Sequence, residues 1–152
     1  MRRPRWGVPA SVAVLLLAGC VSHPVGPART HGKYSGKAST TAESALSAVE
    51  TARLSAQTGS RDHAFGPYLS VILGESEDAV TGVQGTFDSI QPPDEKADQL
   101  KQKLDDLLST AADHLTNLRV AVRRGEIKGL EQLAAPLAGD AKDLQRFMDG
   151  LQ

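Results

Sequence analysis

The chain is short of cysteine and of aromatic residues. Its single cysteine, Cys20, excludes an intramolecular disulfide framework. Aromatic side chains make up only 4% of the 152 residues, which leaves little bulky material for a large rigid core. A chain of this length fits one domain, so a multi-domain arrangement is excluded.

The chain also lacks an excess of positive charge. Three of its 17 basic residues, Arg2, Arg3 and Arg5, precede Cys20, which leaves 14 basic against 18 acidic residues and a net charge of −4 from Cys20 onward. A nucleic-acid-binding protein usually carries a basic face. We therefore expect no nucleic acid partner.

No apolar run is long enough to cross a bilayer. The longest, residues 8–18, is about half of the roughly 20 residues that a membrane-spanning helix needs. It follows a basic start, Met1 to Arg5, and precedes the tetrapeptide Leu17-Ala18-Gly19-Cys20. This order is typical of an export signal that is removed, so residues 1–19 are predicted to be a signal peptide.

The tetrapeptide resembles the lipobox of bacterial lipoproteins. Leu17 stands at its first position, the small residues Ala18 and Gly19 precede the cut, and Cys20 is the acceptor. The resemblance implies cleavage after Gly19, a diacylglyceryl group on the Cys20 thiol and an anchor on the outer face of the cytoplasmic membrane. Two acyl chains give the stable attachment that one chain lacks. An ordinary secretory signal with a free thiol is the alternative, and Arg2-Arg3 leaves twin-arginine export open.

Residues 20–39 are predicted to be a lipidated, disordered tether. The segment is rich in glycine and proline, has no acidic residue and shows no apolar periodicity. Its cations Arg29, Lys33 and Lys37 would contact anionic lipid headgroups, or the segment would be only a spacer in which these charges bind nothing.

Residues 40–152 are predicted to form four amphipathic helices, because apolar residues recur there every three or four positions. The repeat is strongest over 127–151 and weakest over 41–57, where Arg53 interrupts it. No strand pattern is present. The residues expected to face the core are Ala42, Leu46, Val49 and Ala56; Phe65, Leu69, Ile72, Ala79, Val83, Phe87 and Ile90; Leu100, Leu104, Leu107, Ala111, Leu115, Leu118 and Val122; and Ile127, Leu130, Ala134, Leu137, Ala141, Leu144, Met148 and Leu151.

The residues between these helices support the division. Pro92-Pro93 ends the second helix, and Gly125 is a left-handed cap after the third. Pro136 should kink the fourth helix or start it afresh. Such short connections predict an all-α fold, an up-down-up-down antiparallel four-helix bundle. Three longer helices with a loosely attached first segment are the alternative.

No metal or cofactor site is predicted. Helical bundles hold di-iron centres through Glu-x-x-His pairs, but Ala111 stands three residues before His114 and Ser60 before His63. His114 is therefore expected at the edge of the core. Met148 is expected within the core, and as a haem ligand it would lie about 12 residues, roughly 18 Å, from the level of His114.

The residues do not predict an enzyme, because the chain has neither a Gly-x-Ser-x-Gly nucleophile turn nor a glycine-rich phosphate loop. Asp94, Asp98 and Asp105 are spaced to lie along one exposed side of a helix, which would attract a basic partner. In composition and leader alone, the chain resembles small helical lipoproteins of high-GC Gram-positive bacteria. We expect a non-enzymatic interaction module for a protein or cell-envelope partner. The alternative is a small-ligand or metal-ion carrier that uses the acidic second and third helices.

Overall fold

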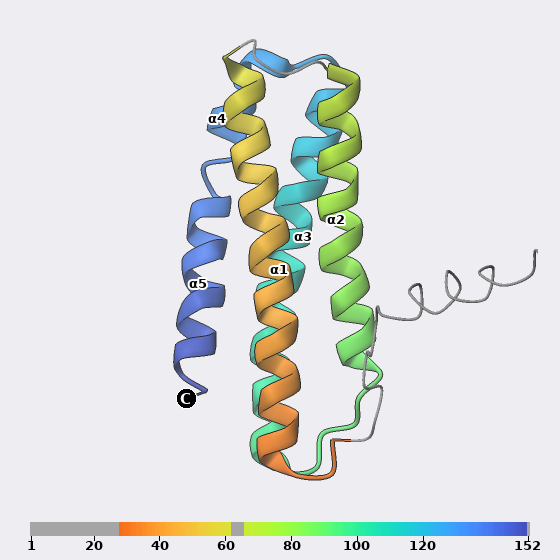
Figure 1. The fold of residues 1–152 in the computed structure, drawn as a ribbon, viewed down its shortest axis with the longest axis vertical. Coiled ribbons are helices and arrows are strands. Elements are labelled where there is room, and N and C mark those ends of the chain that lie inside the picture. Colours follow the sequence, from red (N-terminus) through yellow and green to blue (C-terminus); the bar gives the residue numbers. More distant parts are fainter. Residues whose placement is uncertain (1–27, 62–65, 152) are drawn as a thin grey trace, which may run out of the picture.

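The computed structural model describes residues 28–61 and 66–151, and these residues are all-helical, with no strand among them (Figure 1). The elements are α1 (His31–Ser60), α2 (Gly66–Asp88), α3 (Glu95–Arg123), the 3-10 turn η1 (Ile127–Gly129), α4 (Leu130–Leu133) and α5 (Leu137–Asp149). Counting α4 and α5 as two parts of one helix, four helices pack together along a common axis. In the described part of the chain, no helix is long and apolar enough to cross a membrane.

Helix α1 begins about ten residues earlier than predicted, so the expectation of a disordered segment up to Ser39 is wrong for residues 31–39. The Thr30 side chain accepts a hydrogen bond from the Lys33 backbone N–H (3.4 Å) and caps the helix. Tyr34 and Ala38 are fully buried one turn apart. Among the glycines and lysines of this segment, those two inward residues were too few to predict a helix. Residues 20–27 lie outside the described residues.

Far from being loosely attached, α1 packs against α2, α3 and α5. Its inward side is almost entirely alanine, which lets the neighbouring helices approach closely; its buried alanines are Ala38, Ala42, Ala45, Ala48, Ala52 and Ala56. At its end Gly59 lies against α2, where an added Cβ would come within 2.6 Å of Leu69 Cδ1. The one aromatic pair among the described residues, Tyr34 and Phe87, joins α1 to α2 with ring centroids 5.1 Å apart.

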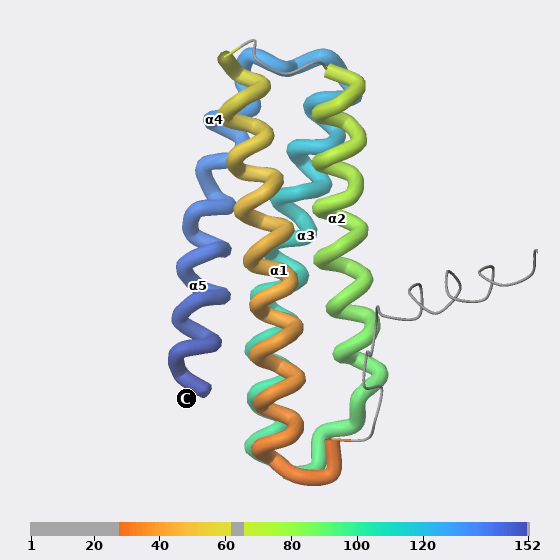
Figure 2. Tube along the Cα trace, viewed as in Figure 1, coloured from red at the N-terminus to blue at the C-terminus, as the bar shows by residue number. Residues whose placement is uncertain are grey.

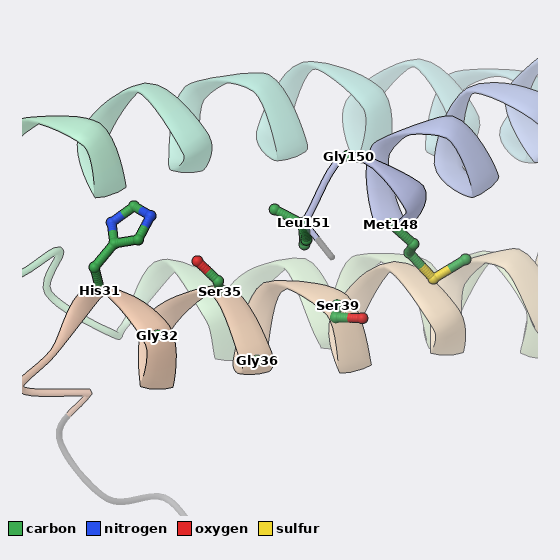
Figure 3. A pocket seen from close by; sticks show the side chains of 8 residues that line it. All are labelled: His31, Gly32, Ser35, Gly36, Ser39, Met148, Gly150 and Leu151. Atoms are coloured by element: carbon green, nitrogen blue, oxygen red, sulfur yellow. The ribbon is translucent and has the colours of Figure 1, made fainter.

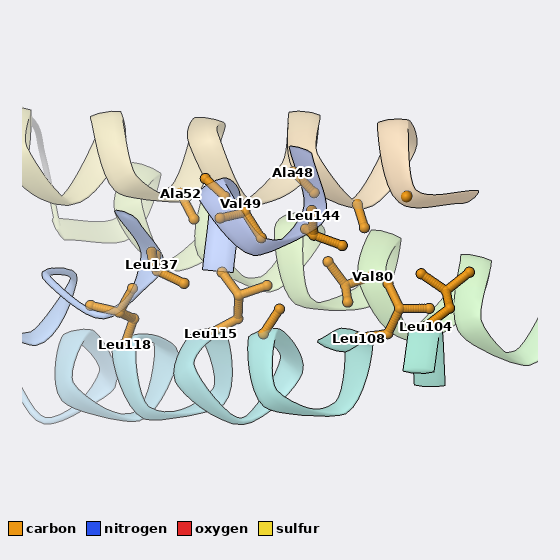
Figure 4. Close-up of a cluster of buried hydrophobic side chains, with 14 of the residues drawn as sticks. Ala48, Val49, Ala52, Val80, Leu104, Leu108, Leu115, Leu118, Leu137 and Leu144 are labelled. Carbon is orange, nitrogen blue, oxygen red and sulfur yellow. The ribbon is translucent and has the colours of Figure 1, made fainter. Parts of the chain in front are cut away.

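The core is a continuous column of aliphatic side chains between the helices. Figure 4 shows leucines of α3 opposite Leu137 and Leu144 of α5, with Val49 and Ala52 of α1 across the column. The predicted inward residues of α3 and of the last helix are buried or packed against this core. In α2 the prediction is partly wrong, because Leu73 and Val80 are fully buried while Ala79 is exposed. Both choices fit a helical spacing, and Phe65 lies outside the described residues.

Both ends of α3 are capped, and the cap predicted at Gly125 is confirmed. Asp94 caps the start, accepting a hydrogen bond from the Ala97 backbone N–H at 2.8 Å. Gly125 follows the end with a φ of 78°, the left-handed conformation that glycine adopts without strain. These two caps fix where α3 starts and stops.

The last helix is interrupted where proline predicted a break. α4 ends at Leu133 and α5 begins at Leu137, directly after Pro136. Proline has no N–H to donate and crowds the preceding turn, so the helix restarts there. Figure 2 shows the chain stepping sideways between α4 and α5, and α5 ending before it reaches the level at which α1 begins.

Candidate functional site

The three acidic residues predicted to face a partner lie along the side of α3 that borders α2. Asp98 is exposed and Asp105 is half-buried. The Gln84 side-chain amide of α2 donates hydrogen bonds to the Asp105 carboxylate and to the Ser109 hydroxyl. Asp105 is therefore partly engaged in holding α2 to α3, and it offers less charge to a partner than the spacing alone predicted.

Asp94 is engaged as well. The hydrogen bond from the Ala97 backbone N–H is the main reason why the pKa of its carboxyl is lowered, and the neighbouring His31 side chain adds to this effect. His31 Nδ1 lies 3.2 Å from Asp94 Oδ1, which joins the start of α1 to the start of α3. Asp94 remains ionised and half-exposed, so it still contributes negative charge to this end of the molecule.

A half-buried polar cluster between α2 and α3 was not predicted. The Arg119 guanidinium donates two hydrogen bonds to the Glu77 carboxylate, and the Thr116 hydroxyl donates a third at 2.9 Å. The hydrogen bonds from Arg119 lower the pKa of Glu77, and Glu77 in turn raises the pKa of Arg119. Glu77 and Arg119 stand 42 positions apart on different helices, so no pattern in the sequence brings them together.

His114 lies at the edge of the core, as predicted, but its partner was not foreseen. Its Nδ1 is 2.7 Å from Oδ2 of Asp140, a carboxylate of α5 that is only 9% exposed. The contact joins α3 to α5 and occupies the ring nitrogen that faces the protein. A group of three His, Cys, Asp or Glu side chains able to hold a metal ion is not found in the described ranges. His63 lies outside them.

A surface cleft of about 460 Å³ lies between the start of α1 and the end of α5. Its floor is formed by small residues of α1, Gly32, Ser35, Gly36 and Ser39, and its rim by His31, Met148, Gly150 and Leu151. Figure 3 shows His31 and Met148 at opposite ends of the cleft, with Leu151 between them. The arrangement does not bring the imidazole and the thioether together as ligands of one ion.

The lipobox residues Leu17, Ala18, Gly19 and Cys20 lie outside the described residues. In comparisons with known proteins, no family model, no curated protein and no solved structure matches this chain. The acidic side of α3, the α3–α5 contact and the cleft are therefore interpreted on their own chemistry.

Proposed function

We propose that this protein is a membrane-anchored lipoprotein, held on the outer face of the cytoplasmic membrane through lipid on Cys20, whose helical body is a non-enzymatic interaction module. The leader that ends in Leu17-Ala18-Gly19-Cys20 carries the proposal for the anchor. A body filled with aliphatic side chains, with acidic residues outside, supports a role in binding a protein or a cell-envelope component.

The anchor is tested by mass spectrometry of the protein purified from its membrane. The expected product begins at Cys20 and carries a diacylglyceryl group. The Cys20→Ala variant should be lost from the membrane fraction without unfolding, since Cys20 precedes the first buried residue of the described chain, Ala28. A retained leader or an unmodified Cys20 in most molecules would contradict the proposal.

We propose further that the four helices alternate in direction, as an up-down-up-down bundle. Three contacts between helix ends support this arrangement. His31 meets Asp94, the end of α1 at Gly59 meets Leu69 near the start of α2, and the Ser60 hydroxyl accepts a hydrogen bond from the Glu131 backbone N–H of α4. A paramagnetic label at the start of α1 should broaden resonances at the start of α3 and at the end of α5.

The partner that fits the acidic side of α3 is a basic protein surface or peptide. Asp94→Asn, Asp98→Asn and Asp105→Asn together should slow association with such a partner and weaken its dependence on salt, because charges attract over about 8 Å at physiological ionic strength. Poly-lysine serves as the first binding partner in a titration. Glu43→Gln, Glu50→Gln and Asp143→Asn remove the same charge elsewhere and should leave the association rate unchanged.

A ligand or metal carrier is the second candidate, and the cleft between α1 and α5 is the observation that favours it. Calorimetry with Ca²⁺ and Zn²⁺ separates the two functions. Stoichiometric binding at micromolar concentrations would replace the interaction module with a carrier. Loss of that binding in the triple Asp→Asn variant would place the site on α3, and unchanged binding would favour the cleft. Negligible heat supports the interaction module.

A further inference from the structure

The outer surfaces of α1 and α2 form a face with little negative charge, here named the α1–α2 face. It is defined by exposed residues that stand three, four or seven positions apart along each helix: Lys33, Thr40, Ser44, Ser47, Thr51 and Leu54 on α1, and Tyr68, Glu75, Ala79, Gly82 and Thr86 on α2. The exposed acids Glu43 of α1 and Asp78 of α2 are not part of it. On α1 the residues of the face lie away from Ser39 and Ser60, which face α5 and α4. On α2 they lie away from Glu77 and Gln84, which bind α3. Both rows therefore border the packed seam of the two helices.

Four of the hydroxyl groups of this face are already hydrogen-bonded. Thr40, Ser44 and Thr51 donate to backbone carbonyls four residues earlier, at 3.1, 2.9 and 2.8 Å, and Thr86 does the same at 2.8 Å. A hydroxyl satisfied by its own helix needs no further partner for its proton, so it tolerates a dry or lipid-lined environment.

Cations and large apolar side chains complete the face. Arg29 and Lys33 are exposed at its anchor-side end, and Leu54 and Tyr68 are 64% and 59% exposed near the other. Glu75 is the only acidic residue among the eleven that define the face. Basic, aromatic and aliphatic side chains together fit the boundary of an anionic bilayer.

The exposed carboxylates of α3 would be repelled by such a bilayer, although Lys96, Lys103 and Arg123 are exposed on the same helix. α3 exposes Glu95, Asp98, Asp106 and Asp113 along its length. The end of the molecule where α1 begins also carries exposed Asp94 and Glu95. A body standing on that end would press these carboxylates against anionic headgroups, whereas a body lying on the α1–α2 face turns them away.

The length of chain before the helices decides how far the body can rise. Only eight positions separate Cys20 from Ala28, which is 3% exposed and fixes the chain against the core. Eight residues reach at most about 27 Å, less than the roughly 45 Å length of α1. The start of α1 therefore stays within about 27 Å of the bilayer, and a body raised to the full reach of this segment carries Arg29 and Lys33 beyond the roughly 8 Å over which headgroup charge acts.

We propose that the body lies on the membrane through its α1–α2 face, with Arg29 and Lys33 among anionic lipid headgroups and Leu54 and Tyr68 at the interface. This inference rests on the proposed lipid anchor and adds an orientation to it. The outer carboxylates of α3, Asp106 and Asp113 among them, then face away from the membrane, where a basic partner can reach them.

The test uses the lipidated protein reconstituted in vesicles of phosphatidylcholine with phosphatidylglycerol as the minor component, the acyl chains brominated near the headgroup. Trp6 is the only tryptophan and lies in the leader, so one introduced tryptophan reports a single position. Ser47→Trp lies on the α1–α2 face, and Asn117→Trp is an exposed position of α3. We expect bromine to quench the fluorescence of the tryptophan at position 47 and not that of the tryptophan at position 117. The unsubstituted protein is the blank.

A second pair of variants tests the charges. Arg29→Gln with Lys33→Gln should shift the ratio of lying to raised bodies about 25-fold, since each cation near the surface contributes about fivefold. The quenching at position 47 should fall in this double variant. In the protein that keeps Arg29 and Lys33, it should fall at high salt. Lys96→Gln with Lys142→Gln removes the same charge from α3 and α5 and should leave the quenching unchanged.

The outcomes separate this inference from the anchor. Flotation with the vesicles but quenching at position 117, or at neither position, overturns the orientation and leaves the anchor in place. Cross-links between copies through Ser47→Cys, without quenching at position 47, would assign the face to a second copy of the chain. An equal effect of the two charge pairs also overturns the orientation, and loss of flotation overturns the anchor and the orientation together.

Discussion

At the scale of single residues, the most unusual group is the hydroxyl of Tyr34. The side chain is fully buried against Phe87, and its oxygen has no hydrogen-bond partner among the described residues. Burial is the main reason why the pKa of Tyr34 rises to about 12, and the charges of Asp88 and Asp98 add to it. The ring is needed for packing, while the hydroxyl adds an unsatisfied polar atom to the core.

Tyr34→Phe should therefore leave the free energy of unfolding unchanged or raise it by up to about 2 kcal/mol, because it removes a buried polar atom and keeps the ring. Urea denaturation followed by circular dichroism measures the change. Tyr68→Phe, at an exposed position, is the matched control and should have no effect. A loss of more than about 1 kcal/mol in Tyr34→Phe would mean that the hydroxyl has a partner.

The Glu77–Arg119 pair gives the second prediction at this scale. Its carboxyl and guanidinium are 17% and 24% exposed, so Glu77→Gln should cost about 1 to 3 kcal/mol at neutral pH. The pKa of Glu77 is lowered in the folded state. Its contribution is therefore complete above the unfolded value of 4.5 and is lost as the pH falls through the lower folded value.

The difference in stability between the unsubstituted protein and Glu77→Gln should be constant at neutral pH and shrink below pH 4.5. Denaturation at a series of pH values measures it, and other titrating groups cancel because both proteins share them. Glu75→Gln on the exposed side of α2 is the control. A difference that grows on acidification contradicts the assignment.

At the scale of elements, the sequence predicted α3 and the last helix well because leucines mark their inward sides and recognisable caps mark their ends. It missed the first turns of α1, where the inward residues Tyr34 and Ala38 stand among glycines and lysines. In α2, Ile72 and Leu73 both fit a helical spacing, and only packing against the other helices selects Leu73. Contacts such as His114–Asp140 could not be predicted, because periodicity places a residue on one side of its helix and does not show which residue of another helix lies opposite.

One pair of neighbours in α3 tests the observed packing. Leu108 is fully buried, whereas Leu107, which the sequence placed in the core, is half-buried at its edge. Leu108→Ala should cost about 2 to 5 kcal/mol, the range for a cavity in a filled core, and Leu107→Ala distinctly less. Chemical denaturation of the two variants measures the loss of unfolding free energy in each. Equal losses would contradict the assignment of Leu108 to the core and Leu107 to its edge.

At the scale of the whole molecule, the helices differ in the contacts that hold them and in the charges that they expose. The surface of α3 exposes Glu95, Asp98, Asp106 and Asp113 among the exposed cations Lys96, Lys103 and Arg123. The helix is joined to α2 by Glu77–Arg119 and to α5 by His114–Asp140. Helix α1 lies between α2 and α5 and depends on small side chains instead of polar contacts. The exposed acids of α3 are thus held on a rigid support, and the α1–α2 face is left with little charge.

The packing of α1 against α5 has a consequence for the order in which the protein is made. The first and last helices of the chain lie side by side, so the alanine side of α1 stays uncovered until residues 137–149 have arrived. If the proposed leader exports the chain from its N-terminal end, α1 reaches the far side of the membrane first and α5 last. The core would then be completed only after residues 137–149 have crossed.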